Sequence, residues 1–128
     1  MNARVLLDTD IVIDYLRSRA PAIAFVRGLS VRPAVSVITI AELYSGVREG
    51  AERKSLDAIS IAFRVIPLSR DIAVRGGIHR RQFRASHGVQ LSDALIAATA
   101  ESIDAQLFTF NTKHYPMLAN VTAPYSKA

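Results

Sequence analysis

The 128-residue chain alternates short apolar runs with longer stretches in which apolar and polar residues recur at helical spacing. Short runs rich in β-branched residues and bounded by Pro or polar residues predict buried strands. Apolar residues three and four positions apart predict helices. The pattern therefore predicts strands at residues 4–7, 34–38, 64–67 and 106–110, with an edge strand at 120–122. It predicts helices at residues 10–18, 20–29, 39–47, 52–63, 69–86 and 91–102, and a short turn or helix at 114–118.

This alternation favours an α/β fold in which right-handed crossovers build a mainly parallel sheet of four to five strands, covered on both faces. No internal repeat, low-complexity segment or Gly/Pro/Ser-rich linker divides the chain, so we expect a single domain over residues 1–128. Open parallel sheets bind their ligands beyond the carboxyl ends of the strands. Residues that follow each strand are therefore the candidates for function.

Composition excludes several kinds of site. The chain has no Cys, which excludes disulfides, thiolate-bound zinc and Cys nucleophiles. Half of the residues are apolar, which is enough for a core, but no apolar run reaches the roughly 18 residues of a membrane span. Asp8, Asp10 and Asp14 interrupt the first apolar stretch, which is untypical of a signal peptide. We expect a soluble, cytoplasmic protein without membrane contact.

Polar side chains follow three of the predicted strands. Asp8 closes the first strand, Glu42 lies about one helical turn beyond the second, and Asn111 follows the 106–110 strand. Asp93, at the start of the helix LSDALIAA, is placed to join them. Carboxylates held close together raise one another's pKa, and a hard divalent cation such as Mg²⁺ or Mn²⁺ removes that cost. Because such a cation activates water and offsets phosphoryl charge, the cluster predicts hydrolysis of a phosphate ester.

Helix capping is the alternative explanation for each acid taken singly. Thr39 and Glu42 have the spacing of a capping box, Ser92 and Asp93 could cap the helix that they precede, and Asp10 could cap the first helix. Capping does not explain why the acids meet at one predicted edge of the sheet.

Four motifs carry a resemblance to a known family: VLLDTDIVIDYL, VSVITIAELYSGV, LSDALIAATA and LFTFNTKHYP. In order and spacing they resemble the PIN-domain family, and within it the VapC-type toxins of toxin–antitoxin pairs. The resemblance covers nearly the whole chain. It implies a three-layer α/β/α domain and a metal-dependent endoribonuclease held inactive by a cognate antitoxin. It also implies a homodimer.

The resemblance also implies roles for individual residues. Asp8, Glu42 and Asp93 would be the metal ligands and, with Asn111, the catalytic set. Asn111 stands where many relatives carry an acid. Because an amide contributes less to cation binding than a carboxylate, we expect one firmly held cation.

Three neighbouring polar residues would support these ligands. The hydroxyl of Thr9 would orient Asp8 or a water, and Thr109 is the polar residue that usually accompanies the fourth site. Asp10 is close enough to the cluster to act as a supporting acid.

Basic residues exceed acidic ones by five, and thirteen of the sixteen are Arg. Six arginines and a single acid lie between residues 58 and 92. A cluster of this kind predicts contact with RNA phosphates, and the candidates are Arg75, Arg80, Arg81 and Arg84. A solvated basic helix face, or a face that meets an acidic antitoxin segment, is the alternative.

Two other functions fit part of the sequence. The Asp8-x-Asp10 pair after an apolar strand is typical of haloacid-dehalogenase-like phosphatases, in which the first Asp is a nucleophile. The chain is short for that family, and Asp93 lacks the nearby second acid that the family uses for Mg²⁺. A non-catalytic α/β module that binds nucleic acid would keep the acids as caps.

Overall fold

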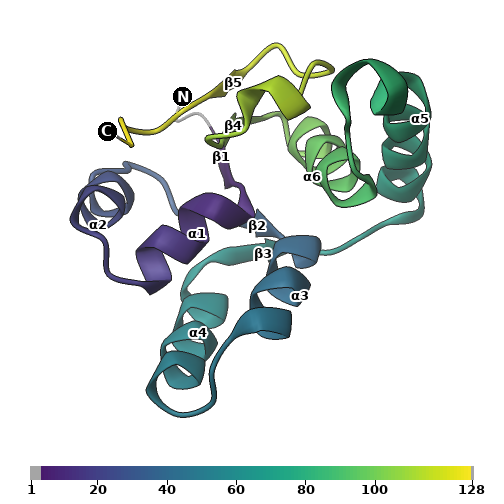
Figure 1. The fold of residues 1–128 in the computed structure, drawn as a ribbon. Helices are drawn as coiled ribbons and strands as arrows, with labels where there is room; N and C mark the ends of the chain where they lie inside the picture. The colour runs from purple at the N-terminus through teal and green to yellow at the C-terminus, as the bar shows by residue number, and fades with distance from the viewer. Residues whose placement is uncertain (1–3, 128) are drawn as a thin grey trace.

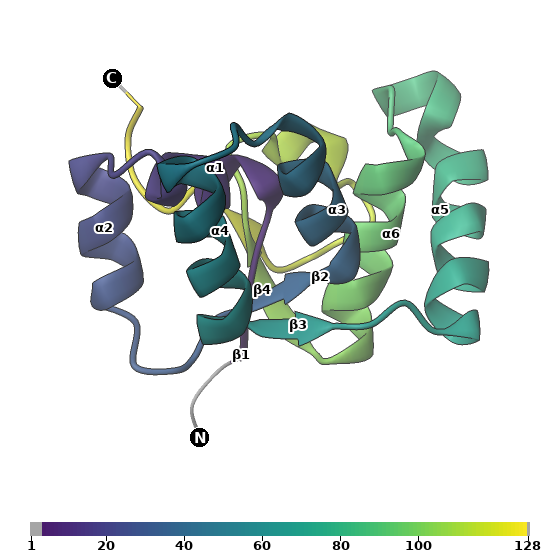
Figure 2. The same cartoon turned by 90° about the horizontal axis from the view of Figure 1, so that it is seen from below.

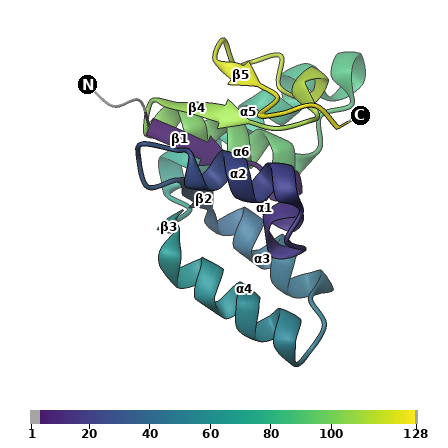
Figure 3. The same cartoon turned by 90° about the vertical axis from the view of Figure 1, so that its left-hand side faces the viewer.

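The computed structural model describes residues 4–127 and contains a five-stranded sheet in the order β3-β2-β1-β4-β5 (Figure 1). Every strand pair in it is parallel, and β1 and β4 appear in Figure 3 as neighbouring arrows that point the same way. The strands are β1 (Arg4–Leu7), β2 (Ala34–Ser36), β3 (Arg64–Ile66), β4 (Ala105–Phe108) and β5 (Val121–Thr122). The predicted α/β class and parallel sheet are confirmed.

Helices cover both faces of the sheet. They are α1 (Thr9–Leu16), α2 (Ala20–Arg27), α3 (Val37–Gly46), α4 (Ala51–Ala62), α5 (Arg70–His87) and α6 (Leu91–Ser102), with a short 3₁₀ helix η1 (Thr112–His114). In Figure 2, α6 lies between the sheet and α5, whereas α2 and α4 lie at the opposite side of the molecule. This is the three-layer arrangement that the resemblance implies. No helix between residues 4 and 127 is long and apolar enough to cross a bilayer.

Side chains on the two faces of β1 pack into two separate hydrophobic cores. Val5 and Leu7 pack with side chains of α1, α3 and α4, whereas Leu6 packs with α6 and β4. All three residues are buried, because a central parallel strand has helices on both of its faces. This double burial explains why the start of the chain is a continuous apolar run.

Helix starts differ from the sequence prediction where a side chain caps the helix earlier than expected. The Ser36 hydroxyl accepts a hydrogen bond from the Ile38 N–H, so α3 begins at Val37 and the predicted 34–38 strand ends at Ser36. Thr39 therefore lies inside α3, and its predicted capping box with Glu42 is wrong.

The other predicted caps are also corrected by the structure. Asp8 caps α1, and Asp10 lies in its first turn. Gln90 caps α6 and forms a capping box with Asp93, so Ser92 is not the cap.

Helices α5 and α6 pack closely because α5 carries a glycine at their contact. A Cβ atom added at Gly76 would lie 2.7 Å from Leu95 Cδ2 and 3.2 Å from Leu95 Cα. The next residue, Gly77, faces open space. The two neighbouring glycines therefore differ in what a methyl group would meet.

We expect Gly76→Ala to lower the free energy of unfolding by about 1–3 kcal/mol, because α5 must move away from the Leu95 backbone. Gly77→Ala is the matched control and should raise stability by about 0.5–1 kcal/mol, since Ala is the better helix former. Urea unfolding measures both variants. Equal effects of the two substitutions would contradict the close contact.

Candidate active site

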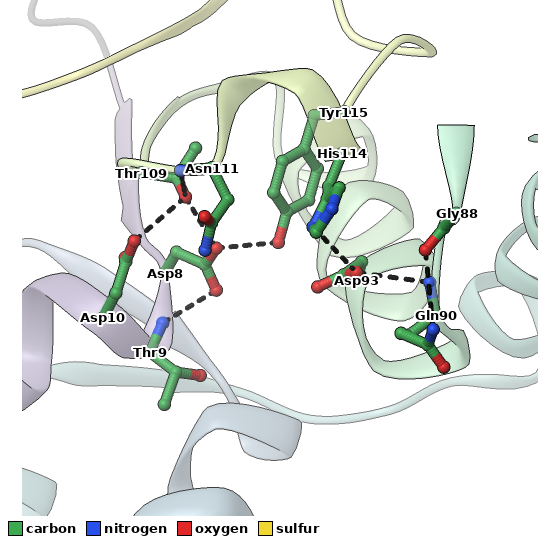
Figure 4. A network of polar contacts seen from close by, with 10 residues as sticks. All are labelled: Asp8, Thr9, Asp10, Gly88, Gln90, Asp93, Thr109, Asn111, His114 and Tyr115. Atoms are coloured by element: carbon green, nitrogen blue, oxygen red, sulfur yellow. Dashed lines mark hydrogen bonds and ion pairs between the residues drawn. The ribbon is translucent and has the colours of Figure 1, made fainter.

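Asp8 lies at the carboxyl end of the central strand β1 and is the most constrained acid of the site (Figure 4). Its side chain is buried, with 6% of the residue exposed. Oδ1 accepts a hydrogen bond from the Thr9 N–H at 2.7 Å, and Oδ2 accepts from the hydroxyls of Thr109 and Tyr115, each at 2.8 Å. Three donors from three segments of the chain therefore fix the orientation of this carboxylate.

Tyr115 connects Asp8 with Asp93 and was not predicted from the sequence. Its side chain is almost fully buried, and in Figure 4 its hydroxyl lies between the two carboxylates. Burial, followed by the charges of Asp8 and Asp93, raises the pKa of Tyr115 far above its usual range. The hydroxyl therefore remains a neutral donor. The contact to Asp8 spans 107 positions, so no local pattern could have predicted it.

Asp93 enters the site from the first turn of α6. Its Oδ2 accepts from the Gln90 N–H at 3.2 Å and lies 3.7 Å from His114 Nδ1. Burial and, more weakly, the charge of Asp8 raise its pKa. Asp93 thus combines the role of a capping residue with a place beside Asp8.

Thr9 joins Glu42 to the site. The Thr9 hydroxyl donates to Glu42 Oε1 at 2.7 Å and lies within hydrogen-bonding distance, 3.0 Å, of the Thr39 hydroxyl. The part of Thr9 that holds Asp8 is its backbone N–H and not its hydroxyl. Glu42 itself is exposed on α3.

Thr109 is the centre of a second small network. This fully buried residue donates to Asp8, lies 3.4 Å from Asp10 Oδ2, and accepts from the Asn111 N–H at 3.0 Å. Asp10 Oδ2 also accepts from the Phe110 N–H at 2.9 Å. The residues predicted to support Asp8 are thereby connected to it, and Asn111 joins the network through its backbone.

Asp10 carries a buried acceptor without a partner. Its Oδ1 has no hydrogen-bond donor among the described residues. Burial, and next the charge of Asp8, raise the pKa of Asp10 to about 6. Asp10 therefore keeps its proton to a higher pH than an exposed aspartic acid does.

The chemistry of these donors fits a hard divalent cation. They are carboxylate oxygens, with an amide nearby, and one of them is the unpartnered Asp10 Oδ1. No three His, Cys, Asp or Glu side chains of residues 4–127 already lie close enough together to hold a metal ion. The Tyr115 hydroxyl donates to Asp8 and lies between Asp8 and Asp93 (Figure 4), whereas Glu42 is joined to the cluster through Thr9.

The predicted RNA-binding arginines lie on α5, mostly in its second half. Arg75, Arg81 and Arg84 are exposed. Arg80 is half-buried, and its Nε has no hydrogen-bond partner among the described residues. Helix α5 ends at His87, and α6 with Asp93 in its first turn starts four residues later, so the end of the basic helix is close in sequence to the site.

Comparison with known proteins identifies the family. Residues 5–117 match the PIN domain model. Ribonuclease VapC10 of Mycobacterium tuberculosis is 39% identical over 127 residues, which cover 95% of this chain and 93% of the relative. Ribonuclease VapC19 of the same organism is 39% identical over 124 residues, covering 94% and 98%.

A solved structure agrees with this result. A chain of a toxin–antitoxin complex from Klebsiella pneumoniae superposes with a TM-score of 0.81 at 30% identity, covering 94% of this chain and 98% of that one. The chain therefore belongs to the PIN domain family, as its motifs indicated.

We expect Asp10 to lower the stability of the metal-free protein as pH rises from 4 to 7. The unfolded state loses the Asp10 proton near pH 3.8, whereas the folded state keeps it until about pH 6. Over that interval the folded state binds more protons, so the free energy of unfolding decreases with pH, by about 2 kcal/mol from this group.

Asp10→Asn should remove that part of the pH dependence, because an amide accepts from Phe110 without titrating. Urea unfolding at pH 4 and pH 7 in EDTA measures the difference. Asp71→Asn, at an exposed acid of α5, is the control and should keep the wild-type pH dependence. An unchanged profile in Asp10→Asn would contradict the assignment.

Proposed function

We propose that this protein is a Mg²⁺- or Mn²⁺-dependent endoribonuclease, the toxin of a toxin–antitoxin pair. The observation that carries the proposal is the buried Asp8 carboxylate, fixed by three donors and separated from Asp93 by one hydroxyl, at the carboxyl edge of a parallel sheet. Two relatives at 39% identity are named ribonucleases. The arrangement of the two acids and the names of the relatives both support hydrolysis of RNA phosphodiester bonds.

Asp8, Glu42 and Asp93 would hold the cation in this proposal, and Asn111 would complete the catalytic set. A divalent cation there supplies Lewis-acid activation of water and offsets the negative charge of the phosphodiester. Glu42 and Asn111 are exposed, so RNA would meet these two members of the set first, with Asp8 buried behind them.

The remaining residues of the site prepare it for that chemistry. Tyr115 and Thr109 donate hydrogen bonds to Asp8, which fixes the orientation of its carboxylate. Asp10 holds the Phe110 N–H and thereby keeps the backbone at Asn111 in place. The Thr9 hydroxyl holds the Glu42 carboxylate close to the cluster until that carboxylate turns to bind a ligand.

We propose a cognate antitoxin and a second copy of this chain as protein partners. The chain from Klebsiella pneumoniae belongs to a structure described as a toxin–antitoxin complex, which supports the antitoxin partner. The homodimer rests on the resemblance to VapC-type toxins.

Asp93→Asn should reduce cleavage of an RNA pool by more than about 100-fold, because it removes a proposed ligand charge. The fold should persist, since the amide oxygen can still accept from the Gln90 N–H. The assay compares Mg²⁺, Mn²⁺ and EDTA, with thermal unfolding as the measure of fold. Asp104→Asn is a matched control far from the network, at a left-handed backbone position that Asn tolerates. Full activity of Asp93→Asn, or cleavage in EDTA, would refute the metal-dependent mechanism.

Replacing Arg80, Arg81 and Arg84 with Gln should reduce the salt dependence of RNA binding. Each lost phosphate contact lowers the slope of log K against log salt by about 0.7 for single strands, so three contacts lower it by about 2. Arg27, Arg48 and Arg64 are exposed elsewhere, and their triple Gln variant removes the same charge. Equal slopes in the two triple variants would remove α5 from the RNA-binding surface.

A further inference from the structure

A buried acid of α1 lies outside the site described above. Asp14 follows Asp10 by about one helical turn and is only 5% exposed. Its Oδ2 accepts a hydrogen bond from the Tyr125 hydroxyl at 2.9 Å and forms an ion pair with Lys127 Nζ at 3.1 Å, and Arg19 Nε lies 3.7 Å from Oδ1. A buried carboxylate requires such partners. Because Tyr125 and Lys127 supply two of them, they attach the 123–127 segment to α1.

The same two residues contact the loop that follows β4. The Tyr125 ring lies 5.0 Å from the Phe110 ring at an interplanar angle of 70°, and Lys127 Nζ lies 4.6 Å from the centre of the Phe110 ring. On its other side the Tyr125 ring approaches Phe25 of α2 at 6.2 Å. Edge-on aromatic pairs and cation–π contacts of this kind are attractive. Phe110 is therefore held by the segment that Asp14 anchors.

Phe110 lies between two residues of the site. It follows Thr109, which donates to Asp8, and precedes Asn111. Its N–H donates to Asp10, one helical turn before Asp14. A closed circuit of contacts thus runs from Asp14 through the 123–127 segment to Phe110, and back to α1 through Asp10.

Side chains, more than close packing, hold the segment in this position. A cleft of about 540 Å³ separates α1 and the start of α2 from the segment, and Asp14, Tyr125 and Lys127 all line it. The contacts of Tyr125 and Lys127 with Asp14 bridge this opening. Without them, the segment would have room to move away from α1, and Phe110 would lose the ring and cation contacts that the segment supplies.

We propose that Tyr125 and Lys127 are positioning residues of the ribonuclease site. They hold the Thr109–Asn111 loop against the start of α1, so that the Thr109 hydroxyl meets Asp8 and the backbone places Asn111 beside it. This inference rests on the proposed function for its catalytic consequence. The structural coupling on which it depends is measurable without activity.

The test is a Tyr125→Phe/Lys127→Met double variant, which keeps the aromatic ring and the aliphatic stem but removes both partners of Asp14. Amide hydrogen exchange in the metal-free protein is the first readout. We expect the Phe110 amide to exchange at least about 10-fold faster, whereas the Leu107 amide, bonded to Asn120 in the sheet, changes little. A Tyr15→Phe/Lys54→Met variant makes the same chemical changes elsewhere and should leave both amides unchanged.

Cleavage kinetics are the second readout. A displaced loop should lower kcat by about 10-fold with little change in KM, at a temperature well below unfolding. Lys127→Arg should retain most of the activity and of the Phe110 protection, because it keeps the charge for Asp14 and for the Phe110 ring. The single variant Lys127→Met provides a milder version, since this side chain is half exposed.

The outcomes separate the two proposals. Equal acceleration of the Phe110 and Leu107 amides would mean that the contacts only stabilise the fold, and would overturn the positioning role. Faster Phe110 exchange with unchanged kcat would overturn it as well. A wild-type protein that cleaves no RNA would refute the ribonuclease function, while the exchange measurement would still decide whether residues 125 and 127 hold the loop.

Discussion

The burial of one charged carboxylate, that of Asp8, constrains the rest of the structure. An ionised group that loses water needs donors of defined geometry, and those of Asp8 come from the start of α1, the end of β4 and the residue after η1. Two of these contacts join positions more than 100 residues apart. The parallel pairing of β1 with β4 is therefore also the condition under which Asp8 can be buried.

The groups that donate hydrogen bonds to Asp8 are uncharged, so they add no positive charge to the site. Asp8 is stabilised by hydroxyls and an N–H, whereas the Arg and Lys ion pairs described within residues 4–127 involve Asp14, Glu49 and Asp57. An arginine beside Asp8 would have compensated the charge and removed the attraction for a cation. The raised pKa values of Asp10 and Asp93 reflect burial and the charge of Asp8.

Local sequence patterns predicted the helices and strands. Where α3 starts, and which residues support the site, depended on hydrogen bonds that these patterns do not show. The apolar runs predicted all five strands, but the β-branched run after Ser36 continued the strand pattern into α3, because a single hydroxyl cap starts that helix. The rule for parallel sheets predicted that Asp8, Glu42 and Asn111 gather at one edge, with Asp93 placed to join them. The roles of Tyr115 and Asp14 were not predicted, because they depend on burial and on partners that are distant in the sequence.

The acids proposed as ligands differ in how firmly they are held. Turning Asp8 away would leave three donors without their acceptor, whereas the exposed Glu42 is held by the Thr9 hydroxyl, a contact worth about 1–3 kcal/mol. In the proposed site Asp8 would determine where a cation binds, and the longer Glu42 side chain would turn towards it at modest cost. Among the described residues, the three proposed ligands do not lie close enough together to hold a metal ion. This arrangement is compatible with a site that closes around its cation.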